Sequence, residues 1–265
     1  MNNPVTYAVI NSMINTAAID LDDTLLRSDG SISPRTLRAL SAWRAAGRRI
    51  VIATGRPRRS VHTCLPVELH DAPWICYNGA EAHENGQRIY ENLIPVAATR
   101  TIVERMQAIA VACEIGLEID NVLYLNREST RPRAYQVANL LEIADRPSAK
   151  VLLFADTLDE FAPLLADLPA EARVLYSARY AFVQILARTA DKAEALRTLL
   201  PTWGATFANV VAFGDDTNDV DMLRASGLGV AVANAVPEVL QVADQITASN
   251  DEDGVALVLE ALLAQ

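Results

Sequence analysis

The stretch Ala17-Ala18-Ile19-Asp20-Leu21-Asp22-Asp23-Thr24-Leu25-Leu26 decides the fold, because a short apolar run ends abruptly in three carboxylates and a hydroxyl. Side chains alternate along a strand, so a buried strand from Thr16 to Asp20 predicts that Asp20 and Asp22 leave it on one side and face one point. Two like charges about 4 Å apart repel by roughly 4 kcal/mol at an effective dielectric constant near 20, so they need a proton or a cation between them. A divalent ion such as Mg²⁺, with carboxylate and phosphate ligands, is the simplest solution. The alternative interpretation is a solvated acidic turn.

The composition indicates a soluble protein of one or two domains. The 265 residues are 51% hydrophobic, enough for a sizeable core, but contain no uninterrupted apolar run that could span a bilayer. We expect residues 1–15 to form an irregular extension and not a signal peptide. Three widely spaced cysteines fit neither a disulfide framework nor a zinc site, which predicts a reducing, cytoplasmic location.

The formal net charge of -10 argues against nucleic acid and anionic membranes as partners. An acidic protein that acts on an anion must concentrate positive groups locally. A metal, a lysine or an arginine is therefore expected near the acidic stretch.

Strands and helices alternate after that stretch. Ser33-Pro34 predicts a helix start and Gly47 its end, with a buried face of Leu37, Leu40 and Trp43. A second apolar strand, 49–54, ends in Thr54-Gly55; Pro57 opens another helix, and a third strand covers 74–79. This alternation is typical of a parallel sheet.

The pattern changes between residues 82 and 186. Here we expect a hairpin around 84–87, helices at 97–113 and 158–168, and strands at 88–93, 117–119, 122–125, 151–155, 174–176 and 182–186. The parallel pattern then resumes with a helix at 191–200, strands at 210–215, 228–232 and 245–247, and a helix at 255–263. The prediction is an α/β, Rossmann-like core from 16–81 and 187–265, with 82–186 as an inserted α+β domain.

The polar residues that end these strands predict one shared site. Open parallel sheets bind ligands outside the carboxyl ends of their strands, at the point where the strand order reverses. If the first strand lies between the second and the Val210 strand, Asp20, Thr54 and Asp215 meet there. Lys192 falls in the first turn of a helix, where the helix dipole disfavours a cation, which suggests a use for its charge. Taken singly, each signal has a plainer interpretation, such as a turn, a solvated loop or a surface lysine.

Asp20, Asp22, Thr54, Lys192 and Gly214-Asp215-Asp216-Thr217-Asn218-Asp219, in this order, resemble the four motifs of the haloacid dehalogenase (HAD) superfamily of phosphatases. The insert between the second and third motifs looks like the type IIB, or C2, cap of the Cof-like sugar-phosphate and cofactor phosphatases. Three further segments also resemble the sequences of that subfamily: Asn78-Gly79-Ala80, Val232-Ala233-Asn234-Ala235 and residues 249–255. The resemblance therefore implies a HAD-like core carrying a cap that selects the substrate.

The resemblance also implies a role for each motif residue. Asp20 would be the nucleophile that forms an aspartyl phosphate, and Asp22 the general acid and base. Mg²⁺ would be held by the Asp20 carboxylate, the Asp22 main-chain carbonyl and Asp215. Thr54, Gly55 and Lys192 would bind the substrate phosphate. In a second layer, Asn218 and Asp219 would orient the metal's waters and Lys192.

The expected function is a Mg²⁺-dependent, cytoplasmic hydrolase that removes phosphate from small metabolites, foremost sugar phosphates. The alternatives are a phosphomutase of the phosphomannomutase type and a non-catalytic ligand-binding relative. The expected partner is a small-molecule phosphate ester, with no nucleic acid and no membrane, for a monomer or small homo-oligomer. The sequence departs from the family pattern at two positions, where Asp23 and Ala193 stand in place of glycine. In the cap, Arg127, Arg131 and Arg133 either contact the substrate or belong to a solubilising loop.

Overall fold

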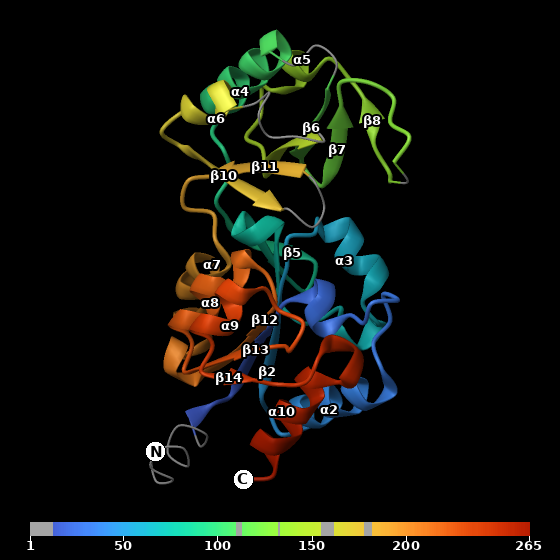
Figure 1. Ribbon diagram of the computed structural model, residues 1–265, viewed down its shortest axis with the longest axis vertical. Coiled ribbons are helices and arrows are strands. Elements are labelled where there is room, and N and C mark those ends of the chain that lie inside the picture. Colours follow the sequence, from blue (N-terminus) through green and yellow to red (C-terminus); the bar gives the residue numbers. More distant parts are fainter. Residues whose placement is uncertain (1–12, 110–112, 132, 155–161, 178–181) are drawn as a thin grey trace. The chain divides into compact units, whose positions relative to one another are not determined.

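The computed structural model describes residues 13–109, 113–131, 133–154, 162–177 and 182–265 (Figure 1). Most of the expected N-terminal extension and the start of the helix expected at 158–168 lie outside these residues. The chain forms two compact units, one from the residues up to Tyr90 together with Asp191–Gln265, the other from Glu91–Ala190. No helix in these ranges is long and apolar enough to cross a membrane.

The first unit is built on an eight-stranded sheet with the order β14-β13-β12-β1-β2-β3-β4-β5. The strands from β14 to β3 pair in parallel, and β4 runs antiparallel to β3. The predicted position of the first strand is confirmed, because β1 pairs with β12 on one side and with β2 on the other. In chain order the strands are β1 (Thr16–Ile19), β2 (Arg49–Ala53), β3 (Trp74–Cys76), β4 (Glu81–Glu84), β5 (Gln87–Glu91), β12 (Val210–Gly214), β13 (Leu228–Ala231) and β14 (Gln245–Ile246).

Helices cover both faces of this sheet (Figure 1). The face with Ala18, Val51 and Ala212 shares a buried cluster with α7, α8 and α9, while α2 and α10 pack against each other on the opposite side. The helices of this unit are α2 (Pro34–Ala45), α3 (Arg58–Cys64), α7 (Lys192–Leu199), α8 (Val220–Ala225), α9 (Pro237–Val242) and α10 (Gly254–Leu263).

Helix α2 begins as its sequence predicts, since the Ser33 side chain accepts a hydrogen bond from the Thr36 amide. Three residues were expected on the buried face of this helix, and the prediction is wrong for one of them. Leu40 and Trp43 are buried, but Leu37 is 37% exposed. The buried stripe runs through Thr36, Leu40 and Trp43 at helical spacing, and Leu37 lies beside it.

The boundary of the insert lies further along the chain than residue 82. Strand β4 folds back on β3, with His83 opposite Trp74 and Glu81 opposite Cys76. The hairpin pattern at 84–87 therefore belongs to the edge of the first sheet, and the chain passes into the second unit at Glu91. A hairpin signal alone does not tell which sheet its strands join.

The second unit has its own six-stranded sheet, in the order β10-β11-β9-β6-β7-β8. The predicted hairpin of β6 and β7 is confirmed, with Asp120 and Asn121 both at positive φ in its turn. Arg131 and Arg133 lie over the ring of Phe154, and Arg133 also pairs with Glu114, which gives these cap arginines structural contacts. The elements are α4 (Val96–Ile109), β6 (Glu114–Ile119), β7 (Val122–Leu125), β8 (Gln136–Val137), α5 (Leu140–Ile143), β9 (Lys150–Phe154), α6 (Ala162–Ala166), β10 (Ala172–Ser177) and β11 (Phe182–Ala187).

Candidate active site

The carboxyl ends of β1, β2 and β12 meet at the middle of the first sheet. Ile19 is level with Phe213 of β12 and with Ile52 of β2, so Asp20 follows directly between the ends of its two neighbours. The Asp20 amide donates to the Phe213 carbonyl at 3.1 Å, which extends the pairing to the acidic residue itself. Asp215 and Thr54 each come one residue beyond the level of Asp20. Sheet register therefore brings three of the predicted site residues to one edge.

Lys192 connects two acids of this edge. Its side chain is fully buried, and its Nζ donates to Asp20 Oδ1 and to Asp219 Oδ1, each at 2.6 Å. The lysine is the first residue of α7, whose N-cap is Asp191, with a side chain that accepts from the Ala193 amide. The unfavourable helix-end position of this cation is thus offset by two charge-assisted hydrogen bonds.

Asp219 reaches the strand end because residue 214 is a glycine. A Cβ on Gly214 would lie 2.4 Å from the Cβ of Asp219, closer than two carbons can approach. With no side chain in the way, Asp219 Oδ2 accepts hydrogen bonds from the amides of Asp215 and Asp216, at 3.1 and 3.2 Å. Both oxygens of Asp219 are therefore engaged, one by the backbone and one by Lys192.

Asp20, Asp215 and Asp219 each offer a carboxylate oxygen within 4.8 Å of the others, and all three are buried. Burial raises the pKa of Asp20 well above its ordinary value; the Lys192 ammonium opposes this, and Asp219, Asp215 and Asp22 add to it. Burial and the charge of Asp219 raise the pKa of Asp215 to about 7, although the Thr24 hydroxyl donates to it at 3.1 Å. Burial would lower the pKa of the Lys192 amine, but Asp20 and Asp219 outweigh burial and hold it above its ordinary value. One ammonium does not neutralise this cluster.

This donor set fits a divalent metal ion. Three carboxylates and one ammonium leave two net negative charges, and oxygen donors are the ligands that Mg²⁺ prefers. Asn218 adds a second observation, because its Oδ1 is buried and has no hydrogen-bond partner among the described residues. An orphaned buried acceptor at this place suits a donor such as a metal-bound water.

Asp22 lies apart from the acidic cluster, contrary to the expectation that it and Asp20 face one point. Its carboxylate receives three hydrogen bonds from Arg56, from Nε to Oδ1 at 3.1 Å and to Oδ2 at 2.9 Å, and from Nη2 to Oδ1 at 2.5 Å. The strand ends at Ile19, and the chain then enters a wide turn in which Asp23 has a φ of +56°, so strand alternation no longer applies. Arg56 is thus a site residue that the sequence analysis does not name, and its position directly after Thr54-Gly55 is the signal that could have indicated it.

The motifs near the C-terminus hold this turn in place. The Asn234 side chain donates to the Asp23 carbonyl at 2.8 Å, and the Asn250 side chain donates to the Leu26 carbonyl at 2.9 Å. The Asn250 amide in turn donates to the Asn234 side chain at 3.0 Å. The segments around 234 and 250, noted only for their resemblance to the family, therefore support the loop that carries Asp22 and Asp23.

Asn78 is a site residue whose role the sequence did not reveal. The side chain of Asn218 donates through Nδ2 to Asn78 Oδ1 at 2.8 Å, and a Cβ on Gly55 would lie 2.9 Å from the same oxygen. The turn after β3 thus joins the turns after β2 and β12. Its next residue, Gly79, has a φ of +90° and lies against the Asp191 carbonyl, so it also contacts the start of α7.

Comparison with known proteins agrees with this arrangement. Residues 17–259 match the family model of haloacid dehalogenase-like hydrolases. The chain belongs to this family. Among curated proteins, 5-amino-6-(5-phospho-D-ribitylamino)uracil phosphatase YitU of Bacillus subtilis is 30% identical, over 92% of this chain and 95% of its own. Pyridoxal phosphate phosphatase YbhA of Escherichia coli is 29% identical, over 90% of this chain and 95% of its own.

Among solved structures, the HAD subclass IIB sugar phosphatase BT4131 has a TM-score of 0.82 at 23% identity, over 93% of this chain and 98% of that one. This likeness agrees with the resemblance to the IIB subfamily and concerns the fold. The family model and the curated relatives together make this chain a phosphatase of the HAD superfamily.

Proposed function

We propose that this protein is a Mg²⁺-dependent phosphatase of small metabolites that works through an aspartyl-phosphate intermediate on Asp20. The observation that carries the proposal is the buried Lys192 amine, which joins Asp20 to Asp219 beside a third acid, Asp215. A lysine so placed keeps one carboxylate ionised and leaves a positive group beside the phosphate of a substrate.

In the first half-reaction, a carboxylate oxygen of Asp20 attacks phosphorus and the bond between phosphorus and the ester oxygen breaks. Asp22 gives its proton to the leaving oxygen. In the second, Asp22 takes a proton from the attacking water, which releases phosphate and restores Asp20. Because Asp22 is paired with Arg56 in this structure, its carboxylate has to leave that arginine to act as the acid.

Thr54 and Gly55 are proposed to hold the substrate phosphate together with Lys192. Thr54 is fully buried at the end of β2, and its Oγ1 accepts from the Arg56 amide at 3.1 Å, which fixes the turn. Its hydroxyl proton stays available for a phosphate oxygen. Asp219 acts through Lys192, which it orients from the side opposite Asp20.

Mg²⁺ would be held by the carboxylates of Asp20 and Asp215 and by the Asp22 main-chain carbonyl, with Asn218 beside its waters. When bound, the ion would supply the positive charge that lets an anionic nucleophile approach an anionic phosphate. Asp215 suits this role because its pKa near 7 reflects a carboxylate that lacks sufficient positive charge nearby.

We propose that the substrates are phosphate monoesters, namely sugar phosphates and phosphorylated cofactors or cofactor precursors. Two relatives are named for substrates of the second kind, a phosphoribitylamino uracil and pyridoxal phosphate. The second unit, which corresponds to the expected cap, is proposed to select among these substrates.

A phosphate-release assay with Mg²⁺ tests the proposal over hexose and pentose phosphates, pyridoxal phosphate and the phosphoribitylamino uracil. Asp20→Asn should lower turnover by about a thousandfold or more, whereas Asp221→Asn, at an exposed acid of α8, should not change it. Chelation should abolish turnover reversibly. Sugar isomerisation that depends on a bisphosphate, without phosphate release, would instead identify a phosphomutase, and full activity in Asp20→Asn would reject the nucleophile.

A further inference from the structure

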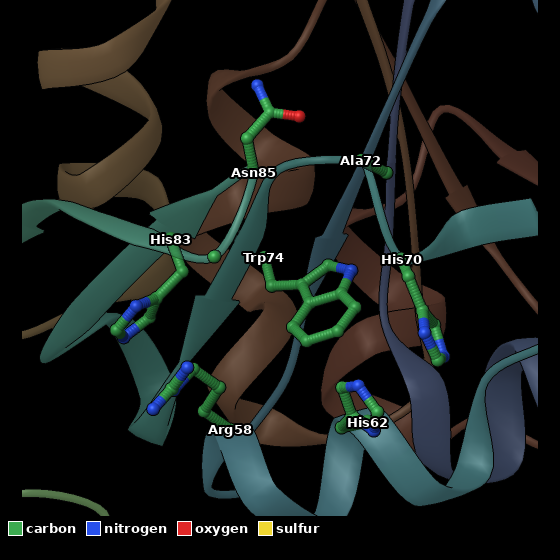
Figure 2. Close-up of a pocket in the computed structure, with 8 residues that line it drawn as sticks. Arg58, His62, His70, Ala72, Trp74, His83 and Asn85 are labelled. Carbon is green, nitrogen blue, oxygen red and sulfur yellow. The ribbon is translucent and has the colours of Figure 1, made fainter. Parts of the chain in front are cut away.

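A second pocket in the first unit gathers all three histidines of the chain. His62, His70 and His83 line it together with Arg58 around the ring of Trp74, and its volume is about 130 Å³. Figure 2 shows Trp74 at the centre, with Arg58 and His62 on the same helix, and His83 and His70 on opposite sides of the indole. Its remaining lining residues are Ala72, Asn85 and Gly86, so it shares none with the acidic cluster.

The lining of this pocket is basic in a protein with a net charge of -10. Among the residues that the structure describes, no aspartate or glutamate lines it. Glu81, which is not a lining residue, accepts a hydrogen bond from His83 Nε2 at 2.9 Å and pairs with Arg88 at 3.5 Å, so its charge is already engaged. The pocket therefore presents one permanent positive charge, on Arg58, and three imidazole rings.

Two buried nitrogens of the pocket wall, Arg58 Nε and His83 Nδ1, have no hydrogen-bond partner within the described part of the chain. The His83 side chain is only 9% exposed, so water does not freely replace the missing partner. Leaving a buried donor unpaired costs about 1–3 kcal/mol, which a ligand with acceptor oxygens would remove. Because His83 Nε2 faces a carboxylate and carries a proton, Nδ1 becomes a donor whenever the ring is charged.

The same contacts argue against a metal ion as the occupant. His70 Nε2 lies 3.0 Å from the Leu65 carbonyl, so it donates there and is not a free ligand. A guanidinium cannot ligate a metal and repels it. In the part of the chain that the structure describes, no three metal-binding groups converge here. His62 and His70 instead lie with their ring centroids 4.3 Å apart, so an anion beside this pair would meet both rings.

We propose that this pocket binds a small oxyanion, such as sulfate, phosphate or a short carboxylate, at a site separate from the one that hydrolyses phosphate esters. Its oxygens accept from Arg58 Nε and from charged His83, while His62 and His70 supply further positive charge. The volume corresponds to about four water molecules at roughly 30 Å³ each, enough for an oxyanion with little hydration.

Imidazole NMR spectra of tag-free protein test the proposal directly, because the three rings of the chain all line this pocket. Sulfate, phosphate and acetate are titrated in turn at pH 6.0 and constant ionic strength, with EDTA present to remove divalent metals. We expect saturable shifts of the ring signals with a dissociation constant on the order of millimolar for at least one of the three anions. The response to each anion separates tetrahedral from planar ligands.

Two variants decide whether the pocket is responsible. Arg58→Met and His62→Gln, at a half-buried and an exposed position, should each weaken binding by about tenfold and leave the fold intact. Arg59→Met, the next residue of the same helix but outside the pocket, should change it less than about twofold. The proposal is overturned if no anion gives a saturable shift, or if Arg58→Met and Arg59→Met weaken binding equally. Ring shifts that appear only with added Zn²⁺ would also overturn it.

Discussion

At the scale of single residues, Lys192 governs the charge balance of the site. Its amine is fully buried between Asp20 and Asp219. Lys192→Met would leave three buried carboxylates without their ammonium, which should lower the free energy of unfolding of the metal-free protein by about 3 kcal/mol. Phosphatase turnover should fall by at least about a hundredfold. Urea unfolding and phosphate release measure the two effects, and Arg197→Met, at an exposed position of the same helix, should leave both unchanged.

Asp23 is one of the two residues at which the sequence departs from the glycine that the family resemblance leads us to expect. Its φ of +56° explains why glycine suits the position, and aspartate is among the residues that tolerate it. Its charge raises the pKa of nearby Asp215, so it also adds negative potential where a phosphate would bind. The substitution Asp23→Asn removes the charge, and asparagine also tolerates the positive φ of this position.

We expect Asp23→Asn to lower the KM for a dianionic substrate about two- to fivefold, with kcat little changed. Initial rates over a range of substrate concentrations measure this, and the effect should shrink in high salt. Glu238→Gln removes an exposed charge elsewhere and serves as the control. An unchanged KM in Asp23→Asn would show that this charge does not reach the substrate.

At the scale of elements, the turn after β3 and the start of α7 depend on a glycine contact. A Cβ on Gly79 would lie 2.1 Å from the Asp191 carbonyl oxygen, and its φ is +90°. Gly79→Ala should therefore push the start of α7 away, which lowers the free energy of unfolding by about 3 kcal/mol or more and displaces Lys192. Gly204→Ala has a similar positive φ but nothing within 4 Å, so it should cost only about 1 kcal/mol. Equal losses in the two variants would mean that the contact is unimportant.

Strands and helices of the first unit were predictable because apolar runs, caps and turn residues agree locally. The strand order around β1 also followed, from the polar residues that end the three strands and the need to bring them together. Two features could not be read from the sequence. The hairpin of β4 and β5 joins the first sheet by pairing with Trp74 and Cys76, a choice that local signals do not make. Likewise, Arg56 pairs with Asp22, which lies 34 residues away in the sequence. The sequence around an arginine next to a helix start does not tell whether its side chain is solvated or paired.

At the scale of the whole molecule, proton binding, metal binding and stability are linked through Asp215. Burial and Asp219 raise its pKa to about 7, above the value near 3.9 expected in the unfolded chain. A carboxyl group whose pKa is raised by folding stabilises the folded state fully below pH 3.9. That contribution is lost as the pH rises through 7. In the metal-free protein, this group should therefore lower the melting temperature between pH 5 and pH 8.

Mg²⁺ should reverse this loss, because an ion bound to the carboxylate replaces the proton. The gain in melting temperature on adding Mg²⁺ should accordingly be larger at pH 8 than at pH 6, where protons compete with the metal. Thermal unfolding at both pH values, with EDTA or with Mg²⁺, measures it. Asp215→Asn, which keeps the shape but neither the charge nor the proton, should lose most of the Mg²⁺ effect and much of the decline with pH. The same Mg²⁺ gain at both pH values, or an undiminished gain in Asp215→Asn, would place the metal away from Asp215 and remove the basis for its role in catalysis.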